Sequence, residues 1–140
     1  MEKKIKTLNI STKGQGFYEI TKNINEQINN TKIKNGLLTI YIQHTSCSLL
    51  IQENADSDVK KDLLNFFSKL VPENDNYIHN SEGPDDMPAH IKSCLTQTNL
   101  SIPIENFNLN LGTWQGIYLF EHRKNKHERK IKLHIIGENG

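Results

Sequence analysis

Two histidines and three carboxylates are packed into residues 77–90, and they are the side chains best suited to chemistry in this chain: His79, Glu82, Asp85, Asp86 and His90. Neutral imidazole and carboxylate together form the ligand set of zinc, manganese and similar divalent ions. Two histidine ligands need a third, which either His44 or Asp86 could supply. The alternative is that these are surface histidines, held only by hydrogen bonds. No HExxH or P-loop pattern fixes a metal or nucleotide independently.

A second polar group begins at His44 and continues through Thr45, Ser46 and Ser48. Hydroxyl and backbone N–H groups at this position could hold phosphate oxygens. The two aspartates that follow, Asp56 and Asp58, could add to such a site. They are equally suited to capping the start of a helix.

A third group is Gly112-Thr113-Trp114-Gln115. The glycine permits close backbone approach, Thr113 and Gln115 can hydrogen-bond a ligand, and Trp114 can stack on a heteroaromatic ring. The alternative places Trp114 in the core and makes the Gly-Thr pair a bulge or turn.

The basic stretch 121–130 could grip a polyanion, but it has no aromatic residue that would stack on bases. We therefore expect most of it to be a solvated turn. Arg123 and Arg129 are the exceptions, because an arginine at a strand end can hold phosphate through two hydrogen bonds.

The composition points to a small, nearly neutral protein. The 140 residues are enough for one domain spanning 1–140, and a net charge of +1 gives no overall field for nucleic acid or membrane. The two cysteines are far apart and share no CxxC spacing, which disfavours a disulfide framework. With no apolar run of about 18 residues, we expect a cytoplasmic protein that binds neither nucleic acid nor membrane.

The apolar pattern indicates which elements position these groups. A strand over 36–43, bounded by Asn35-Gly36, ends at His44, and Ile5, Leu8 and Ile10 alternate only roughly. A helix is expected over 21–30 behind a threonine N-cap. Another strand covers 48–51, and an amphipathic core helix runs from 56 or 58 to 70, with Pro72 just beyond its end.

From 73 to 86 the composition is that of a long loop, and such loops are often functional. A further helix is expected from 84 or 87 to 96. Strands should follow over 100–104, 109–111, 113–121 and 128–136, the last with Ile131, Leu133 and Ile135 on a buried face. Helices grouped among strands in this way indicate an α+β fold.

Three ordered motifs spanning nearly the whole chain resemble those of the YjbQ family, also called uncharacterised protein family 0047. They are His44-Thr45-Ser46-x-Ser48-Leu49-x-Ile51-x-Glu53, then Tyr77-x-His79-x-x-Glu82-Gly83-x-Asp85-Asp86-x-x-Ala89-His90, then Leu111-Gly112-Thr113-Trp114-Gln115-x-Ile117-x-Leu119-x-Glu121. The sequence departs from the family at Asn99, where serine is usual, and at Phe107, where glycine is usual.

The resemblance implies a two-sheet β-sandwich of about seven strands and two or three helices, assembled as a homotrimer around a threefold axis. It also implies a site that holds a divalent metal or an anion near the subunit boundary, with the three motifs meeting in it. The activity linked to the family is a secondary thiamine-phosphate synthase reaction, which joins hydroxymethylpyrimidine diphosphate to thiazole phosphate.

In that reaction diphosphate leaves, so a metal ion, magnesium or zinc, would neutralise developing charge. On this reading the metal ligands are His79 and His90 with His44 or Asp86, and the acid–base or orienting groups are His44, Glu53, Glu82 and Asp86. The groups that hold a phosphorylated substrate are Thr45, Ser46, Thr113, Trp114, Gln115 and Arg123. The alternatives are a metal-dependent hydrolase of a phosphorylated metabolite, or a protein that binds metal or such a metabolite without turnover.

Overall fold

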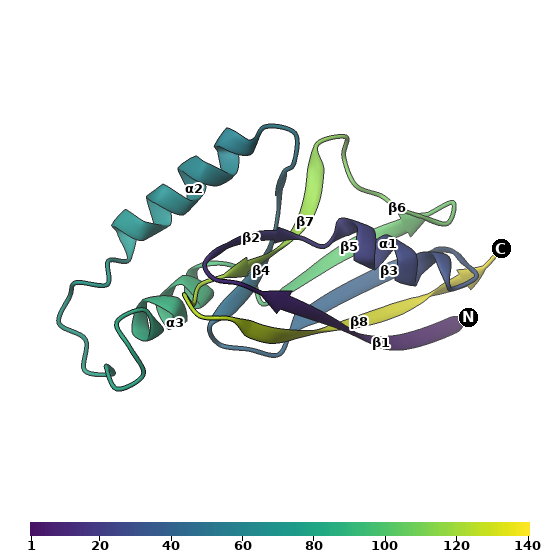
Figure 1. Ribbon diagram of the computed structural model, residues 1–140. Helices are drawn as coiled ribbons and strands as arrows, with labels where there is room; N and C mark the ends of the chain where they lie inside the picture. Colours follow the sequence, from purple (N-terminus) through teal and green to yellow (C-terminus); the bar gives the residue numbers. More distant parts are fainter.

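The computed structural model covers residues 1–140 and has an α+β fold with two antiparallel sheets and three helices (Figure 1). The larger sheet has the strand order β1-β8-β3-β5-β6 and the smaller one β2-β7-β4. The strands are β1 (Glu2–Thr12), β2 (Gly16–Glu19), β3 (Ile33–Ile42), β4 (Cys47–Glu53), β5 (Asn99–Glu105), β6 (Asn108–Leu109), β7 (Gln115–Glu121) and β8 (His127–Asn139). The helices are α1 (Thr21–Asn29), α2 (Ser57–Leu70) and α3 (Asp86–Leu95). The α+β prediction is confirmed.

The alternation in β8 directs its apolar side chains into the core, as the sequence predicts. Ile131, Leu133 and Ile135 are fully buried, and the residues between them are only partly covered. β8 pairs with both β1 and β3, so it lies inside the larger sheet. A strand with two neighbours needs one consistently apolar face, and this pattern supplies it.

β1 shows only a rough alternation in the sequence because one of its apolar residues faces outward. Leu8 and Ile10 pack against the core, whereas Ile5 is 71% exposed. Leu8, Ile10 and Thr12 therefore lie on the face of the strand that points to the core, and Ile5 lies on the opposite face.

The Asn35-Gly36 pair does not bound the strand as expected, because β3 begins earlier, at Ile33. The ladder between β3 and β8 shifts register between Ile33 and Asn35, which marks a bulge. Gly36 faces Gly137 so closely that a Cβ on Gly36 would lie 2.2 Å from the Ile136 carbonyl oxygen. Glycine is needed here for close strand contact.

Both sheets and α1 contribute to one hydrophobic core. Ile24 and Ile28 of α1 are buried in it, as their four-residue spacing predicts. The threonine N-cap prediction is wrong, because α1 has no side-chain cap. The Thr21 hydroxyl instead donates to Glu19 and accepts the N–H of Ile117, which ties the start of α1 to β7.

α2 is the main difference between the expected and the observed fold. Asp56 caps it as predicted, with a carboxylate oxygen 2.9 Å from the N–H of Asp58. However, no residue of α2 is buried, and Phe66 and Leu70 are 56% and 52% exposed. Figure 1 shows α2 extending away from the two sheets. The prediction of a core helix is therefore wrong for a single chain.

The segment between α2 and α3 is a long loop, as expected, and α3 follows it across the end of β4. None of the three helices combines the length and the apolar character that a membrane span requires. In the β5–β6 turn, Asn106 and Phe107 have positive φ values of 49° and 69°. Glycine adopts this conformation at less cost, so Phe107 accepts strain at this turn.

Candidate functional site

α3 presents two candidate ligands on one face, because Asp86 and His90 are one helical turn apart. The Nε2 atom of His90 lies 3.3 Å from Oδ2 of Asp86. His79 reaches the same oxygen from the preceding loop, with its Nε2 atom 2.6 Å away. One ligand atom from each of the three residues lies within 4.8 Å of the other two. Within one chain, Asp86 rather than His44 is the third member of this cluster.

The loop that carries His79 turns into α3 at Gly83, which has a φ of 104°. This left-handed conformation suits glycine. The Gly83 carbonyl then accepts the N–H of Asp86, which starts the helix. Glu82 lies beside the turn with one carboxylate oxygen 3.5 Å from Nε2 of His79, and its side chain is 63% exposed. It is therefore placed to exchange protons with solvent next to the cluster.

A backbone hydrogen bond sets the orientation of the His90 ring. Its Nδ1 atom lies 2.9 Å from the carbonyl oxygen of Thr45. A carbonyl only accepts hydrogen bonds, so Nδ1 carries the proton. In the neutral ring Nε2 then has a free lone pair, and it faces Asp86. This arrangement is common for metal-binding histidines, in which the second nitrogen is fixed by a backbone carbonyl.

Arg123, at the end of β7, holds the two aspartates together. Its Nε donates to Asp85 at 2.9 Å, its Nη1 to Asp86 at 2.7 Å, and its Nη2 to the Glu82 carbonyl at 2.9 Å. From the sequence, Arg123 is expected to bind a phosphate group, but these hydrogen bonds indicate that it positions Asp86. Burial by itself would raise the pKa of Asp86, yet hydrogen bonding to His79 and the charge of Arg123 keep this pKa below its ordinary value.

The cluster fits a divalent cation in ligand type and in spacing. In a tetrahedral zinc site with bonds of about 2.0–2.1 Å, neighbouring ligand atoms are about 3.4 Å apart. The 3.3 Å between Asp86 and His90 already matches this spacing. The 2.6 Å contact of His79 is a hydrogen bond and is shorter than a metal site requires. The His79 side chain is 45% exposed, so it can move back to make room.

His44 lies near this cluster but is engaged elsewhere. Its Nε2 accepts the backbone N–H of Lys130 at 2.8 Å, which is possible only for the neutral ring. Burial, followed by the charge of Arg129, lowers the pKa of His44. The nitrogen that would bind a metal is therefore occupied, and His44 offers a ligand its Nδ1–H group instead.

Behind His44 lies a buried ion pair between the two sheets, and it fixes the turn that carries Ser46. The Nε of Arg129 donates to Glu121 at 2.8 Å, and its Nη2 donates to Oγ of Ser46 at 3.0 Å. Glu121 also accepts the hydroxyl of Thr12 at 2.6 Å. Burial opposes ionisation of Glu121, but hydrogen bonds from Arg129 and Thr12 hold its pKa below the ordinary value. The expectation of a solvated turn is wrong for Glu121. Arg129, an expected exception that could hold phosphate, instead binds the Glu121 carboxylate.

A second buried group next to this ion pair was also not expected. His122 is 1% exposed, and its Nε2 lies 2.8 Å from Oγ of Ser48. Its Nδ1 has no hydrogen-bond partner. Burial, aided by the charges of Lys92 and Arg129, lowers the pKa of His122 to about 3. Lys92 is itself only 4% exposed, so α3 and β7 enclose polar side chains between them.

The Gly-Thr-Trp-Gln segment lies at the opposite end of the smaller sheet. Glu53 pairs with Gln115, whereas Cys47 pairs with Glu121 next to the histidine cluster. β4 has 7 residues, so these ends are about 20 Å apart. The expectation that all three motifs meet in one site is therefore not met within one chain.

The local contacts of that segment are those of a turn. The N–H of Gly112 donates to the side-chain oxygen of Gln115 at 2.8 Å, and Glu53 accepts the N–H of Asp56 at 3.2 Å. Thr113 is exposed and Trp114 is 62% exposed. Trp114 is thus not a core residue, and its ring is available to a ligand or a partner.

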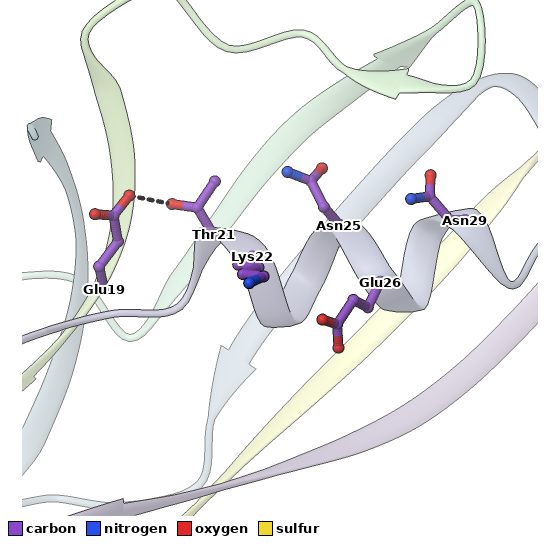
Figure 2. Close-up of a pocket in the computed structure, with 6 residues that line it drawn as sticks. All are labelled: Glu19, Thr21, Lys22, Asn25, Glu26 and Asn29. Carbon is purple, nitrogen blue, oxygen red and sulfur yellow. Dashed lines mark hydrogen bonds between the residues drawn. The ribbon is translucent and has the colours of Figure 1, made fainter.

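A surface hollow beside α1 is unrelated to the cluster. It measures about 550 Å³ and is lined by Glu19, Thr21, Lys22, Asn25, Glu26 and Asn29. Figure 2 shows Asn25 and Asn29 pointing to one side of α1 and Glu26 to the other, so these side chains do not converge. The only hydrogen bond drawn joins Thr21 to Glu19. With no histidine or arginine in its lining, this hollow lacks the chemistry of the α3 cluster.

Known proteins resemble this chain over nearly its full length. The family model for UPF0047 protein YjbQ-like matches residues 6–138. A UPF0047 protein of Synechocystis is 49% identical over 130 residues, covering 92% of this chain and 88% of its own. The UPF0047 protein YjbQ of Escherichia coli O157:H7 is 44% identical, covering 95% and 97%.

Solved structures agree with the fold. A crystal structure of a YjbQ/UPF0047 family protein from Clostridium acetobutylicum superposes with a TM-score of 0.83 at 33% identity, covering 92% of this chain and 99% of its own. A protein of unknown function from Sulfolobus solfataricus superposes with a TM-score of 0.86 at 22% identity, covering 98% and 100%, and so shares the fold. Sequence and structure together make this chain a member of the YjbQ (UPF0047) family.

Proposed function

We propose that His79, Asp86 and His90 bind a divalent metal ion and that the protein acts on a phosphorylated small molecule there. The observation that carries this proposal is the His90 ring, whose Nδ1 is fixed by Thr45 while Nε2 faces Asp86. Surface histidines have no need of such an arrangement, whereas metal ligands do. The two oxygens of the buried Asp86 carboxylate support the same reading, because Oδ1 is paired with Arg123 while Oδ2 faces both histidines.

Zinc suits this ligand set better than magnesium does. Two imidazoles and one carboxylate are frequent zinc ligands, whereas magnesium prefers oxygen ligands in octahedral geometry. Three protein ligands also leave a position open, as in catalytic rather than structural zinc sites. When bound, the ion would neutralise charge on phosphate or diphosphate oxygens.

The reaction that we put first is the secondary thiamine-phosphate synthase reaction implied by the family resemblance. In it diphosphate leaves hydroxymethylpyrimidine diphosphate as a bond to the thiazole nitrogen forms. The chain's own contribution would be positional: Arg123 holds Asp86, Thr45 holds His90, and the exposed side chain of Thr45 offers a hydroxyl beside His90.

Hydrolysis of a phosphorylated metabolite is the second candidate, and one observation favours it. The exposed carboxylate of Glu82 lies 3.5 Å from His79, where it could accept a proton from an attacking water. Synthase chemistry has no comparable need for an exposed base beside the metal.

One assay separates these candidates from a protein that only binds. The zinc-loaded protein is incubated with both pyrimidine and thiazole substrates, and thiamine phosphate, diphosphate and inorganic phosphate are each measured. Thiamine phosphate with equimolar diphosphate supports the synthase, and phosphate without thiamine phosphate supports the hydrolase. Activity should disappear in His90→Ala and persist in His134→Ala, which alters a β8 residue paired with Ile5 and Thr39. Full zinc occupancy without any product would reject catalysis.

We also propose that the protein assembles as a homotrimer. The support is α2, which buries none of its residues and leaves Phe66 and Leu70 more than half exposed. Apolar side chains repeated along one helix generally mark a surface that a partner covers. Assembly would also give Trp114 and Glu53 of one subunit a route to the histidine cluster of the next.

A further inference from the structure

The loop between α2 and α3, residues 71–85, carries His79 and is weakly attached to the rest of the chain. Figure 1 shows it at the edge of the molecule, between the two helices. Of its residues only Val71 and Asp85, at its two ends, are buried, and Ile78 is fully exposed. No backbone hydrogen bond joins the middle of the loop to a strand or to another helix. Packing and backbone pairing therefore do not fix the middle of the loop.

Two consecutive residues of the β7–β8 connection hold this loop near both of its ends. The Nζ of Lys124 donates to Oε1 of Glu73 at 2.7 Å, close to the start of the loop. At the other end, Nη2 of Arg123 donates to the carbonyl of Glu82 at 2.9 Å. The backbone N–H of Lys124 donates to Oδ2 of Asp85, also at 2.9 Å. The start and the end of the loop are thus tied to the same short segment.

His79 depends on these contacts more than the other two members of the cluster do. Asp86 and His90 both belong to α3, which fixes their separation. His79 reaches Asp86 from the loop, through a side chain that is 45% exposed. In the first half of the loop, Glu73 makes the only other side-chain hydrogen bond that leaves the loop. The ion pair of Glu73 is therefore the contact that can hold His79 in place.

We propose that Lys124 is a positioning residue for the metal site: through Glu73 it keeps the loop closed and His79 within reach of Asp86. This proposal rests on the proposed function. It assigns a role to a residue that itself forms no hydrogen bond with a member of the cluster.

The exposure of the ion pair separates this role from a role in overall stability. The side chains of Lys124 and Glu73 are 55% and 31% exposed, and an exposed ion pair changes an equilibrium by at most about fivefold. Such a change is small beside the unfolding equilibrium of a whole domain. It is large for a surface loop, because loops open at little cost in free energy. Zinc affinity falls with the fraction of closed loop, so reversing either charge should lower it about two- to fivefold.

Reversal of each charge in turn distinguishes loop closure from direct attraction of the zinc ion. Lys124→Glu makes the region more negative and Glu73→Lys makes it more positive, so direct attraction would move zinc affinity in opposite directions. Loss of the ion pair lowers the affinity in both variants. The double variant exchanges the two charges and should bind zinc within about twofold of the wild type. Opposite shifts in the single variants, or no recovery in the double variant, would overturn the proposal.

Lys126→Glu is the matched control, because it reverses an exposed charge in the same connection and should leave zinc affinity unchanged. A second arm uses the His79→Ala background, in which Lys124→Glu should cause no further loss of zinc affinity, because Lys124 acts only through His79. Calorimetry measures each affinity. A loss that persists without His79 would overturn the positioning role.

Loop closure can be measured without zinc, by the rate at which chymotrypsin cleaves the chain after Tyr77. Both single variants should be cleaved faster than the wild type, and the double variant should return to the wild-type rate, while urea unfolding stays nearly unchanged in all of them. Equal cleavage rates in the four proteins would overturn closure by the ion pair. A wild type that binds no zinc but shows the expected cleavage pattern would instead reject the proposed function, and the positioning role with it, while the ion pair still closes the loop.

Discussion

Nδ1 of His90 lies 2.9 Å from the carbonyl oxygen of Thr45, and this hydrogen bond joins two motifs that are 45 residues apart. It connects α3 to the turn after β3. It also fixes which nitrogen of His90 is protonated, so that Nε2 faces Asp86 and His79. The cluster is therefore held by the fold and does not depend on a bound ion to orient His90.

Arg123→Lys should weaken metal binding while retaining the positive charge. A lysine cannot bridge Asp85 and Asp86 as the guanidinium does. Loss of such a supporting contact typically lowers metal affinity by about 10–100-fold. Zinc titration calorimetry measures this change, with Lys126→Ala in the same β7–β8 connection as an exposed control. An unchanged affinity would show that Arg123 does not position Asp86.

Glu121→Gln should destabilise the fold strongly. The change leaves the buried charge of Arg129 without its partner, and breaking such a pair costs about 3–5 kcal/mol. Urea unfolding measures the free energy of unfolding. Glu128→Gln, at an exposed position of β8 next to Arg129, should change it by less than about 0.5 kcal/mol. Similar losses in both variants would argue against the importance of the buried pair.

His122 should make the protein less stable in mild acid. Its pKa is lowered to about 3 in the folded chain, whereas an unfolded histidine has a pKa of about 6.5. Between these values the unfolded chain binds the extra proton, so stability falls as the pH falls. The loss between pH 7.5 and 5 is about 2 kcal/mol from this residue.

His122→Gln should remove most of that pH dependence, although it also lowers stability at neutral pH. His44, whose pKa is lowered too, would supply part of the remaining slope. Asp85, Asp86 and Glu121 have lowered pKa values, so their destabilising protonation belongs to a lower pH range. Urea unfolding at pH 7.5 and 5 provides the comparison. Parallel slopes in variant and wild type would contradict a buried, neutral His122.

The double variant Phe66→Glu, Leu70→Lys should disrupt the proposed trimer without unfolding the chain. Neither side chain is buried within one chain, so circular dichroism should stay unchanged. Light scattering should give about three times 16.1 kDa for the wild type and one chain mass for the variant. Lys69→Glu, an exposed site on the same helix, should remain trimeric. A monomeric wild type would reject the trimer.

The strands were predictable because their alternation is local. The buried ion pair follows the same alternation. Arg129 lies on the same face of β8 as Ile131, and Glu121 lies on the same face of β7 as Leu119. From the sequence alone, neither Arg129 nor Glu121 is expected to be buried, because charged side chains are almost never fully buried unless they are paired. The partner of each lies on a strand of the other sheet, and only the three-dimensional structure brings the two together.

The cluster of His79, Asp86 and His90 was partly predictable for a related reason. Asp86 and His90 are spaced by one helical turn, so their proximity follows from the helix alone. The roles of Arg123 and Thr45 depend on packing between distant segments, which spacing does not reveal. The exposure of α2 could not be predicted either, because an amphipathic pattern shows which face of a helix is apolar but not what covers that face.

Zinc titration of the chelator-treated protein tests the central claim most directly. The wild type should bind one zinc ion per chain, and His79→Ala and His90→Ala should each lose affinity by at least about tenfold. His134→Ala should bind zinc like the wild type, because its side chain lies on β8 outside the cluster. A wild type that binds no zinc, or His79→Ala and His90→Ala variants that bind it normally, would contradict the metal site.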